Sequence, residues 1–311
     1  MKRLYISILA LSCCIATFAQ TAPKANLALQ VVVENMVEPF PPAAKAQMTN
    51  KLTALLTQNG IASSDWQNQF IITAFMVPQT KDILPGAPTQ IAETMDVTFY
   101  IADVYNQLIF ATTTMSAKGV GPTEAKSYMD ALRHINLNAP QLATFVQEGK
   151  DKIINYYNTQ APAIFEKAMT LAKMKDYTQA MFLLATIPAE CDQFAQANAY
   201  GLQVYQMFID NDCQKNLAAA RAAWSAQQNA EGAKAAGEYL QLIYPDATCY
   251  AEAMELYREI KAKVLDDWKF EMKKYQDSVD LESQRIAAWR GVGTAYGQHQ
   301  QPQTTNIGFL R

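Results

Sequence analysis

Hydrophobic and polar positions alternate along part of the first half of the chain. Val97, Phe99 and Ile101 are separated by single residues, and a similar run follows over residues 108–115 after a turn at residues 106–107. A period of two is typical of half-buried strands, because successive side chains of a strand point to opposite faces. The two runs and the turn between them predict a β-hairpin with one face toward a core.

Short apolar runs, prolines and glycines mark the other elements before residue 160. The run over residues 70–77 predicts a strand that ends at Pro78, and the glycine-rich segment 119–121 is expected to end the hairpin. The remaining elements are a strand over residues 27–34 and helices over residues 41–58, from residue 123 and over residues 139–157. This order of strands and helices predicts a small mixed α/β domain of the α+β class over residues 20–160.

Helical periodicity replaces the alternation beyond Gln160, and it contains an internal echo. Three apolar positions and a following proline occur twice: Ala180, Leu184, Ile187 and Pro188, then Ala236, Leu240, Ile243 and Pro245. Turns are expected at residues 175–176, 187–188 and 210–212. One helical hairpin cannot bury its apolar stripe alone, so the echo predicts an all-α domain of stacked helical hairpins over residues 161–297.

The end of the chain is predicted to hold a long helix and a tail. Apolar residues recur at every fourth position, a spacing that suits packing along a neighbouring helix. They are Leu256, Ile260, Val264, Trp268 and Met272. Residues 298–311 are too polar to pack at their start and are expected to form a flexible tail.

The amino terminus has the features of a secretory signal. Lys2 and Arg3 precede a short apolar stretch, and small residues lead to an expected cleavage after Ala19. We therefore expect residues 1–19 to be a signal peptide and the mature protein to be exported, to the periplasm in the preferred interpretation. An alternative, in which Cys13 carries a lipid anchor, stays open. No later run reaches the roughly 20 apolar residues of a spanning helix, so no transmembrane segment is expected in the mature chain.

Composition and charge argue against several classes of function. The formal net charge of −3 becomes −5 when Lys2 and Arg3 leave with the signal. Nucleic acid is therefore not an expected partner, because phosphate binding needs clustered Lys and Arg. The chain has 2 histidines, and the cysteines of the mature chain are widely spaced, so neither a metal site nor another cofactor is expected. With 50% hydrophobic residues, the chain has enough apolar surface for a packed core.

Cys191, Cys213 and Cys249 remain after removal of the signal. In an oxidising compartment, an odd count favours one disulfide and one free thiol. If the helices reverse direction at the expected turns, Cys213 and Cys249 lie at one end of the hairpins and Cys191 at the other. We therefore predict a disulfide between Cys213 and Cys249 with Cys191 reduced. Three separate buried thiols remain the alternative.

The residue types that carry chemistry do not form a recognisable catalytic set. Residues 119–121 lack the third glycine of a dinucleotide fingerprint, and no Gly-Lys-Ser/Thr follows them. Asp266 and Asp267 are adjacent, so on a helix they point about 100° apart. His134 follows Asp130 by one helical turn, a spacing that suits a surface pair. No catalytic residue is assigned, and the chain is not expected to be an enzyme.

Tyrosines are concentrated in the helical half and are the candidate binding residues. They are Tyr200, Tyr205, Tyr239, Tyr244 and Tyr257. Tyrosine gives a large contact area with a polar tip and is enriched at binding surfaces, so these residues are candidates for a groove. In the alternative interpretation they fill gaps between alanine-rich helices.

Two segments resemble known families. Residues 173–188, with Asp176-Tyr177 followed by Ala180 and Leu184, resemble the second helix of a tetratricopeptide repeat. This resemblance implies helical hairpins that bind a protein partner. Residues 27–158 resemble the small α/β domain of envelope assembly proteins, a group that includes the flagellar T protein, the curli secretion lipoprotein and the TolB amino-terminal domain. That resemblance implies a docking module without chemistry.

These expectations lead to one functional hypothesis and one rival. The leading hypothesis is an exported cell-envelope protein that acts as an interaction or assembly scaffold for a protein partner. The rival is an envelope enzyme or carrier that binds a small glycan or peptidoglycan fragment. A pocket with two carboxylates about 5 to 10 Å apart would favour the glycan enzyme, and a shallow groove lined by tyrosine would favour the scaffold.

Overall fold

The computed structural model describes residues 27–33, 42–63, 69–264, 268–273 and 281–300. The expected signal peptide with Cys13, residues Asp266 and Asp267, and residues 301–311 of the expected tail lie outside these ranges. The elements in chain order are β1 (Gln30–Val31), α1 (Pro42–Gln58), β2 (Phe70–Leu84), β3 (Gln90–Asp103), β4 (Leu108–Gly121), α2 (Glu124–His134), α3 (Pro140–Lys173), α4 (Tyr177–Ala185), α5 (Phe194–Ala226), α6 (Ala230–Leu240), α7 (Tyr250–Val264) and α8 (Leu281–Gln300).

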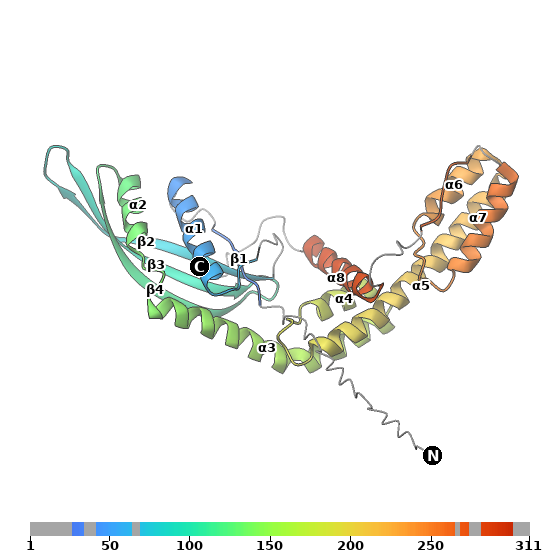
Figure 1. The fold of residues 1–311 in the computed structure, drawn as a ribbon, viewed down its shortest axis with the longest axis horizontal. Helices are drawn as coiled ribbons and strands as arrows, with labels where there is room; N and C mark the ends of the chain where they lie inside the picture. The colour runs from blue at the N-terminus through green and yellow to red at the C-terminus, as the bar shows by residue number, and fades with distance from the viewer. Residues whose placement is uncertain (1–26, 34–41, 64–68, 265–267, 274–280, 301–311) are drawn as a thin grey trace, which may run out of the picture.

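The molecule is elongated, with a sheet at one end and the α6–α7 pair at the other (Figure 1). The long helices α3 and α5 join these ends, and α4 and α8 lie at the junction between them. An N-terminal mixed sheet with helices is thus followed by an all-helical region. The predicted α+β class is confirmed.

The sheet has the strand order β1-β2-β3-β4, with β1 parallel to β2 and the other pairs antiparallel. The predicted hairpin is β3–β4, in which Val97 pairs with Met115 and Phe99 with Thr113. The side chains of Val97, Phe99 and Ile101 are buried, as the alternation predicted. They belong to the same core cluster as buried residues of α1, α2 and α3, so one face of the sheet is covered by helices.

β2 does not end at Pro78 but continues to Leu84. The register shifts between Pro78 and Thr80, which marks a bulge at the proline. Among the described residues, β1 pairs with β2 only at Ile71 and Ile72, so the rest of β2 is a sheet edge. At an edge, a proline without an N–H costs no ladder hydrogen bond, and the strand passes through it.

Residues 119–121, which were expected to end the hairpin, belong to strand β4. Gly119 and Gly121 allow α2 to pack closely on this strand. β4 runs to Gly121, and α2 then begins after its N-cap Thr123, near the predicted position. A Cβ at Gly119 would collide with the carbonyl oxygen of Ser127, and one at Gly121 would lie 2.6 Å from the backbone nitrogen of Ser127. The absence of side chains at both positions therefore lets α2 lie directly on the strand.

A buried carboxyl group lies beneath α2. Glu93 on β3 pairs with Gly119 on β4 and is 2% exposed. Neither of its carboxyl oxygens accepts a hydrogen bond from the described residues, and the neighbouring hydroxyl of Ser127 donates to the carbonyl oxygen of Gly119 at 2.9 Å. Desolvation by burial raises the pKa of Glu93, and the negative charge of Glu124 adds to this effect, while Ser127 and Lys81 oppose it.

Glu93→Gln should therefore make the stability of the protein less dependent on pH. The folded state holds the Glu93 proton at a pH where the unfolded chain has lost it, so wild-type stability falls as pH rises through the folded pKa. We expect Glu93→Gln to be more stable than wild type at pH 7, with the difference shrinking toward pH 4. Urea unfolding at several pH values measures this. Glu255→Gln, an exposed change on α7, is the control, and an unchanged Glu93→Gln profile would contradict the prediction.

α3 is longer than predicted and passes through the expected joint at residues 158–160. It spans 34 residues, with Pro162 inside the helix. Its first part packs on the sheet, where Gly149 meets Ile101, and its last part packs on α4. The expected boundary at residue 160 therefore falls inside a helix, and one continuous core cluster extends across it.

Three further expectations about helix ends are wrong. The turn at residues 210–212 is helical, because α5 runs unbroken over 33 residues. α7 ends at Val264, so Trp268 and Met272 do not continue its stripe, although both are buried in the non-helical segment 268–273. α8 extends to Gln300, so the expected tail begins in a helix.

The two echoed segments have the same backbone hydrogen bonds. After α4, the N–H groups of residues 187, 191, 194 and 197 donate to the carbonyl oxygens of residues 184, 188, 191 and 193. After α6, the N–H groups of residues 243, 247, 250 and 253 donate to those of residues 240, 244, 247 and 249. Each bond recurs 56 residues later, so Cys191 corresponds in geometry to Ala247 and not to Cys249.

Candidate functional site

A pocket of about 290 Å³ lies where the sheet meets the helical region. It is lined by the β3–β4 turn, by one face of α3, by the end of α4 and by Gly297 of α8. Aromatic rings form much of the lining: Tyr105 from the turn, Tyr156 and Tyr157 from α3, and Phe182 from α4. The pocket is the candidate functional site because four separate elements converge on it.

A network of polar side chains, centred on the buried Asp103 and Tyr157, lies beside the pocket. The carboxylate of Asp103 accepts hydrogen bonds from the side chains of Gln69, Asn106 and Tyr157. It also accepts from the backbone N–H groups of Tyr105 and Asn106, at 2.9 and 3.0 Å. Asp103 is fully buried, so these five bonds replace the water that it lost on folding. The network thereby ties the turn to the middle of α3.

The hydroxyl of Tyr157 is the centre of this network. It donates to Asp103 and accepts from the side-chain amides of Gln69 and Asn106. Desolvation by burial, together with the charge of Asp103, raises the pKa of Tyr157 well above its ordinary value. The hydroxyl therefore keeps its proton and acts as a hydrogen-bond donor within the network.

Tyr157→Phe should lower the free energy of unfolding by about 2 kcal/mol, because Asp103 and two amides lose a buried partner. Tyr156→Phe is the matched control: its hydroxyl forms no hydrogen bond with the described residues, and we expect a change below about 0.5 kcal/mol. Urea unfolding of both variants measures the difference. Equal stability of the two variants would show that the network adds nothing.

Two polar side chains of the lining, besides that of Tyr156, form no hydrogen bond or ion pair with the described residues. These are Gln160 and Lys167, both on α3. Gln160 is half-buried, and Lys167 is exposed at the mouth of the pocket. They are seven positions apart, about two helical turns, so they lie on the same side of α3. Lys167 is the charged residue of the described lining.

The predicted binding tyrosines are spread over the helical region. They are Tyr200 and Tyr205 on α5, Tyr239 on α6, Tyr244 in the loop before α7, and Tyr257 on α7. Tyr205 and Tyr244 come together, with ring centroids 6.3 Å apart, but Tyr205 is buried. Tyr257 packs against Trp268, whereas Tyr239 is 40% exposed. Their role in binding a partner stays a prediction.

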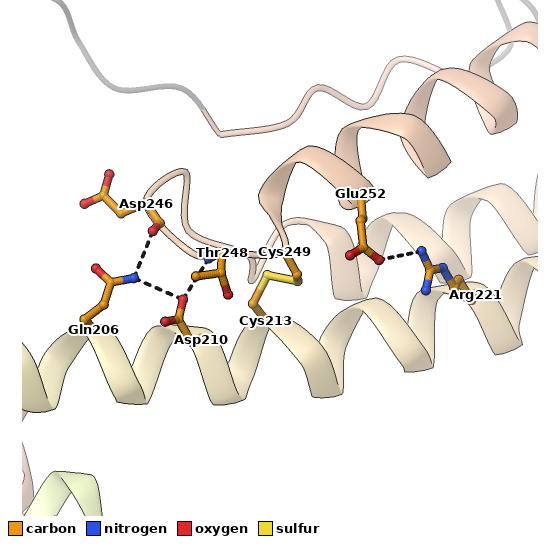
Figure 2. The surroundings of a disulfide bond; sticks show 8 residues. All are labelled: Gln206, Asp210, Cys213, Arg221, Asp246, Thr248, Cys249 and Glu252. Carbon is orange, nitrogen blue, oxygen red and sulfur yellow. Dashed lines mark hydrogen bonds and ion pairs between the residues drawn. A yellow bond between two sulfur atoms is a disulfide. The ribbon is translucent and has the colours of Figure 1, made fainter.

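Cys213 and Cys249 form a disulfide, the pairing that was predicted, and Cys191 is a buried free thiol. The Cα atoms of the bonded pair are 6.0 Å apart. Figure 2 shows that the bond fastens the start of α7 to the middle of α5. Burial, with smaller effects of the neighbouring carboxylates, raises the pKa of Cys191 to about 11. This thiol is therefore protonated and unreactive at neutral pH.

The reason given for the pairing was wrong. Cys213 does not follow a turn between two helices but lies within α5, and it meets Cys249 because the loop after α6 crosses this helix. Polar contacts hold the loop in place: Asp210 accepts from the backbone N–H of Thr248 at 2.7 Å, and Gln206 donates to the carbonyl oxygen of Asp246 at 3.0 Å (Figure 2).

In the part of the chain that the structure describes, no group of three or more His, Cys, Asp or Glu side chains is arranged to hold a metal ion. His134 and Asp130 form the predicted pair, with 3.9 Å between Nδ1 and Oδ2. None of the described helices combines the length and apolar character needed to cross a membrane.

Comparison with known proteins assigns no family. No protein-family model matches the chain, and no curated protein sequence is similar to it. Among solved structures, the chain is similar to a minor lipoprotein from Acinetobacter baumannii, with 19% identity and a TM-score of 0.26. The match covers 40% of this chain and 94% of the lipoprotein.

Proposed function

We propose that the protein is an exported, non-catalytic scaffold of the cell envelope, whose two ends hold partner proteins apart. The observation that carries this proposal is the extended frame of α3 and α5. A helix of 33 residues is about 50 Å long at 1.5 Å per residue, so α5 alone sets the α6–α7 pair far from the junction. A spacer between two partners depends on such a length.

The disulfide and the expected export signal support an envelope location. Disulfides persist in oxidising compartments such as the periplasm and are rare in the cytosol. The bond fixes the loop after α6 to the middle of α5 (Figure 2). A scaffold that must keep its shape outside the cell benefits from this constraint.

The same pattern of backbone hydrogen bonds occurs in the two echoed segments, and it supports a tetratricopeptide-like helical repeat. In each unit, a short helix is followed by the same loop and then by the next helix. In such arrays each unit packs on its neighbours and the stack presents a surface to a partner. Tyr239 and Leu242, which are 40% and 49% exposed near the end of α6, are apolar side chains available for such a contact.

For the rival, an envelope enzyme or carrier, a pocket with two carboxylates about 5 to 10 Å apart would support glycoside chemistry. The described lining of the junction pocket contains Lys167 and no Asp or Glu. Glycoside chemistry therefore has no acid and base in this pocket.

A comparative capture experiment tests the scaffold. The full-length mature protein and the Tyr239→Ser/Leu242→Ser variant serve as baits for envelope extracts, with Lys234→Ser as a control on an exposed part of the same helix. We expect one or more proteins to bind the wild type and the control but not the double variant. If all three baits recover the same proteins, the end of α6 is not part of the binding surface. If the wild type recovers no protein, the scaffold proposal is contradicted.

A further inference from the structure

We propose that the junction pocket binds a small aromatic carboxylate. This inference is independent of the scaffold and rests on the lining of the pocket, the free polar groups and the size of the cavity. The pocket would give the protein a ligand-binding activity at the junction of its two halves.

The walls of the pocket favour a flat, aromatic guest. Tyr105 and Phe182 pack edge to face, with ring centroids 5.4 Å apart, and Tyr156 and Tyr157 form a second such pair at 5.1 Å. One pair joins the turn to α4 and the other lies on α3, and all four rings line the cavity. Aromatic rings attract another ring through offset-stacked or edge-to-face contacts. A ring that enters the pocket meets partners of this kind on several elements.

The free polar groups favour a negatively charged guest. Lys167 stands at the mouth without an acidic partner among the described residues, and no carboxylate of those residues lines the cavity. An ammonium group repels a cationic ligand and forms charge-assisted hydrogen bonds with a carboxylate. Gln160, whose amide is also without a partner in the described part of the chain, adds hydrogen bonds beside it.

The buried charge nearest the pocket does not reverse this preference. Asp103 is not a lining residue, and its oxygens accept five hydrogen bonds within the network. Tyr157, Asn106 and the backbone N–H of Tyr105 donate to this carboxylate, and the three residues line the cavity. Its negative charge is therefore compensated by donors, while the charge of Lys167 is not.

The cavity admits a ligand of about one ring. Its volume of about 290 Å³ is at the lower end of the roughly 300–1,000 Å³ that is typical of small-molecule pockets. A phenyl or hydroxyphenyl ring with a short acidic side chain fits this volume, with the ring between the aromatic pairs and the acid toward Lys167.

Three probes with the same ring and different charge test the proposal. Isothermal titration of the full-length mature protein uses 4-hydroxyphenylacetate, the neutral 4-hydroxyphenylethanol and the cationic tyramine, with N-acetylglucosamine as a probe that lacks an aromatic ring. We expect the carboxylate to bind about three- to tenfold more tightly than the alcohol and the amine to bind most weakly. Binding of the sugar alone, or of none of the probes, would overturn the proposal.

Variants of α3 locate the binding. Lys167→Gln should bring the affinity for the carboxylate down to that for the alcohol, whereas Lys173→Gln, an exposed change outside the lining, should leave both affinities as they are. Ala163→Phe should fill the cavity and abolish binding of every probe, and Met169→Phe is its control. Circular dichroism verifies that each variant is folded. A carboxylate preference that survives Lys167→Gln, or binding that survives Ala163→Phe, would also overturn the proposal.

Discussion

Replacing both Cys213 and Cys249 with alanine should lower the free energy of unfolding by about 3–4 kcal/mol. The bond closes a loop with a sequence separation of 36, and a cross-link of this span removes that much conformational freedom from the unfolded chain in the entropy model. The double variant avoids leaving one new free thiol. Urea unfolding of the oxidised wild type and of the variant measures the difference.

Two controls separate the bond from the packing of its sulfur atoms. Reduced wild type lacks the same constraint but keeps both buried sulfur atoms, so it should unfold at a higher urea concentration than the double variant, and the difference measures the packing of these atoms. Cys191→Ala removes a buried thiol that forms no disulfide, and it should cost only about 1 kcal/mol. Equal stability of oxidised and reduced wild type would show that the bond does not stabilise the fold.

Alanine at Gly293 should destabilise the protein by about 2–4 kcal/mol, whereas alanine at Gly291 should stabilise it by up to about 1 kcal/mol. Both glycines are inside α8. A Cβ at Gly293 would lie 2.7 Å from the carbonyl carbon of Met181, so α8 would have to move away from α4. A Cβ at Gly291 meets nothing within 4 Å, and the change there only removes the low helix propensity of glycine.

Both substitutions add the same methyl group to α8, but only the one at Gly293 places it against α4. Thermal or urea unfolding, with hydrogen exchange of α8 amides as a local readout, distinguishes them. We expect faster exchange in α8 for Gly293→Ala and equal or slower exchange for Gly291→Ala. Parallel effects of the two changes would mean that α8 does not pack on α4 in solution.

The strands could be predicted because their signal is local. The alternation at Val97, Phe99 and Ile101 defines both the hairpin and its buried face, whatever the rest of the chain does. The helix ends could not be predicted in the same way. Residues 210–212 have the composition of a turn, but Ile209 and Cys213 are four positions apart and both buried, so packing on one face keeps α5 helical through them.

The pocket was missed because its residues are distant in sequence. Tyr105, Phe182 and Gly297 meet only after the sheet, α4 and α8 have packed on α3. Two local signals were present. Asp103 lies at the start of a hairpin turn, where an aspartate side chain typically accepts hydrogen bonds from the backbone N–H groups that follow it. The Tyr156-Tyr157 pair precedes Gln160, which is one turn further along the same helix.

The Cys213–Cys249 pairing was predicted correctly, but from a wrong arrangement of the helices. The prediction placed Cys213 beyond a helix end, and the structure places it within α5. The pairing is set by the loop after α6, where Thr248 and Asp246 bind to α5 and bring Cys249 beside Cys213.

The unbroken course of α3 connects the sheet to α4 through a single helix. Because one part of the helix packs on the sheet and its last part packs on α4, no loop within residues 140–173 can absorb a change of angle between the sheet and α4. A rotation of about 5° displaces the far end of a 50 Å arm by about 4 Å, given the rise of 1.5 Å per residue. A small change of angle at the sheet would thus displace the last turns of α3, and α4 with them, by about that distance.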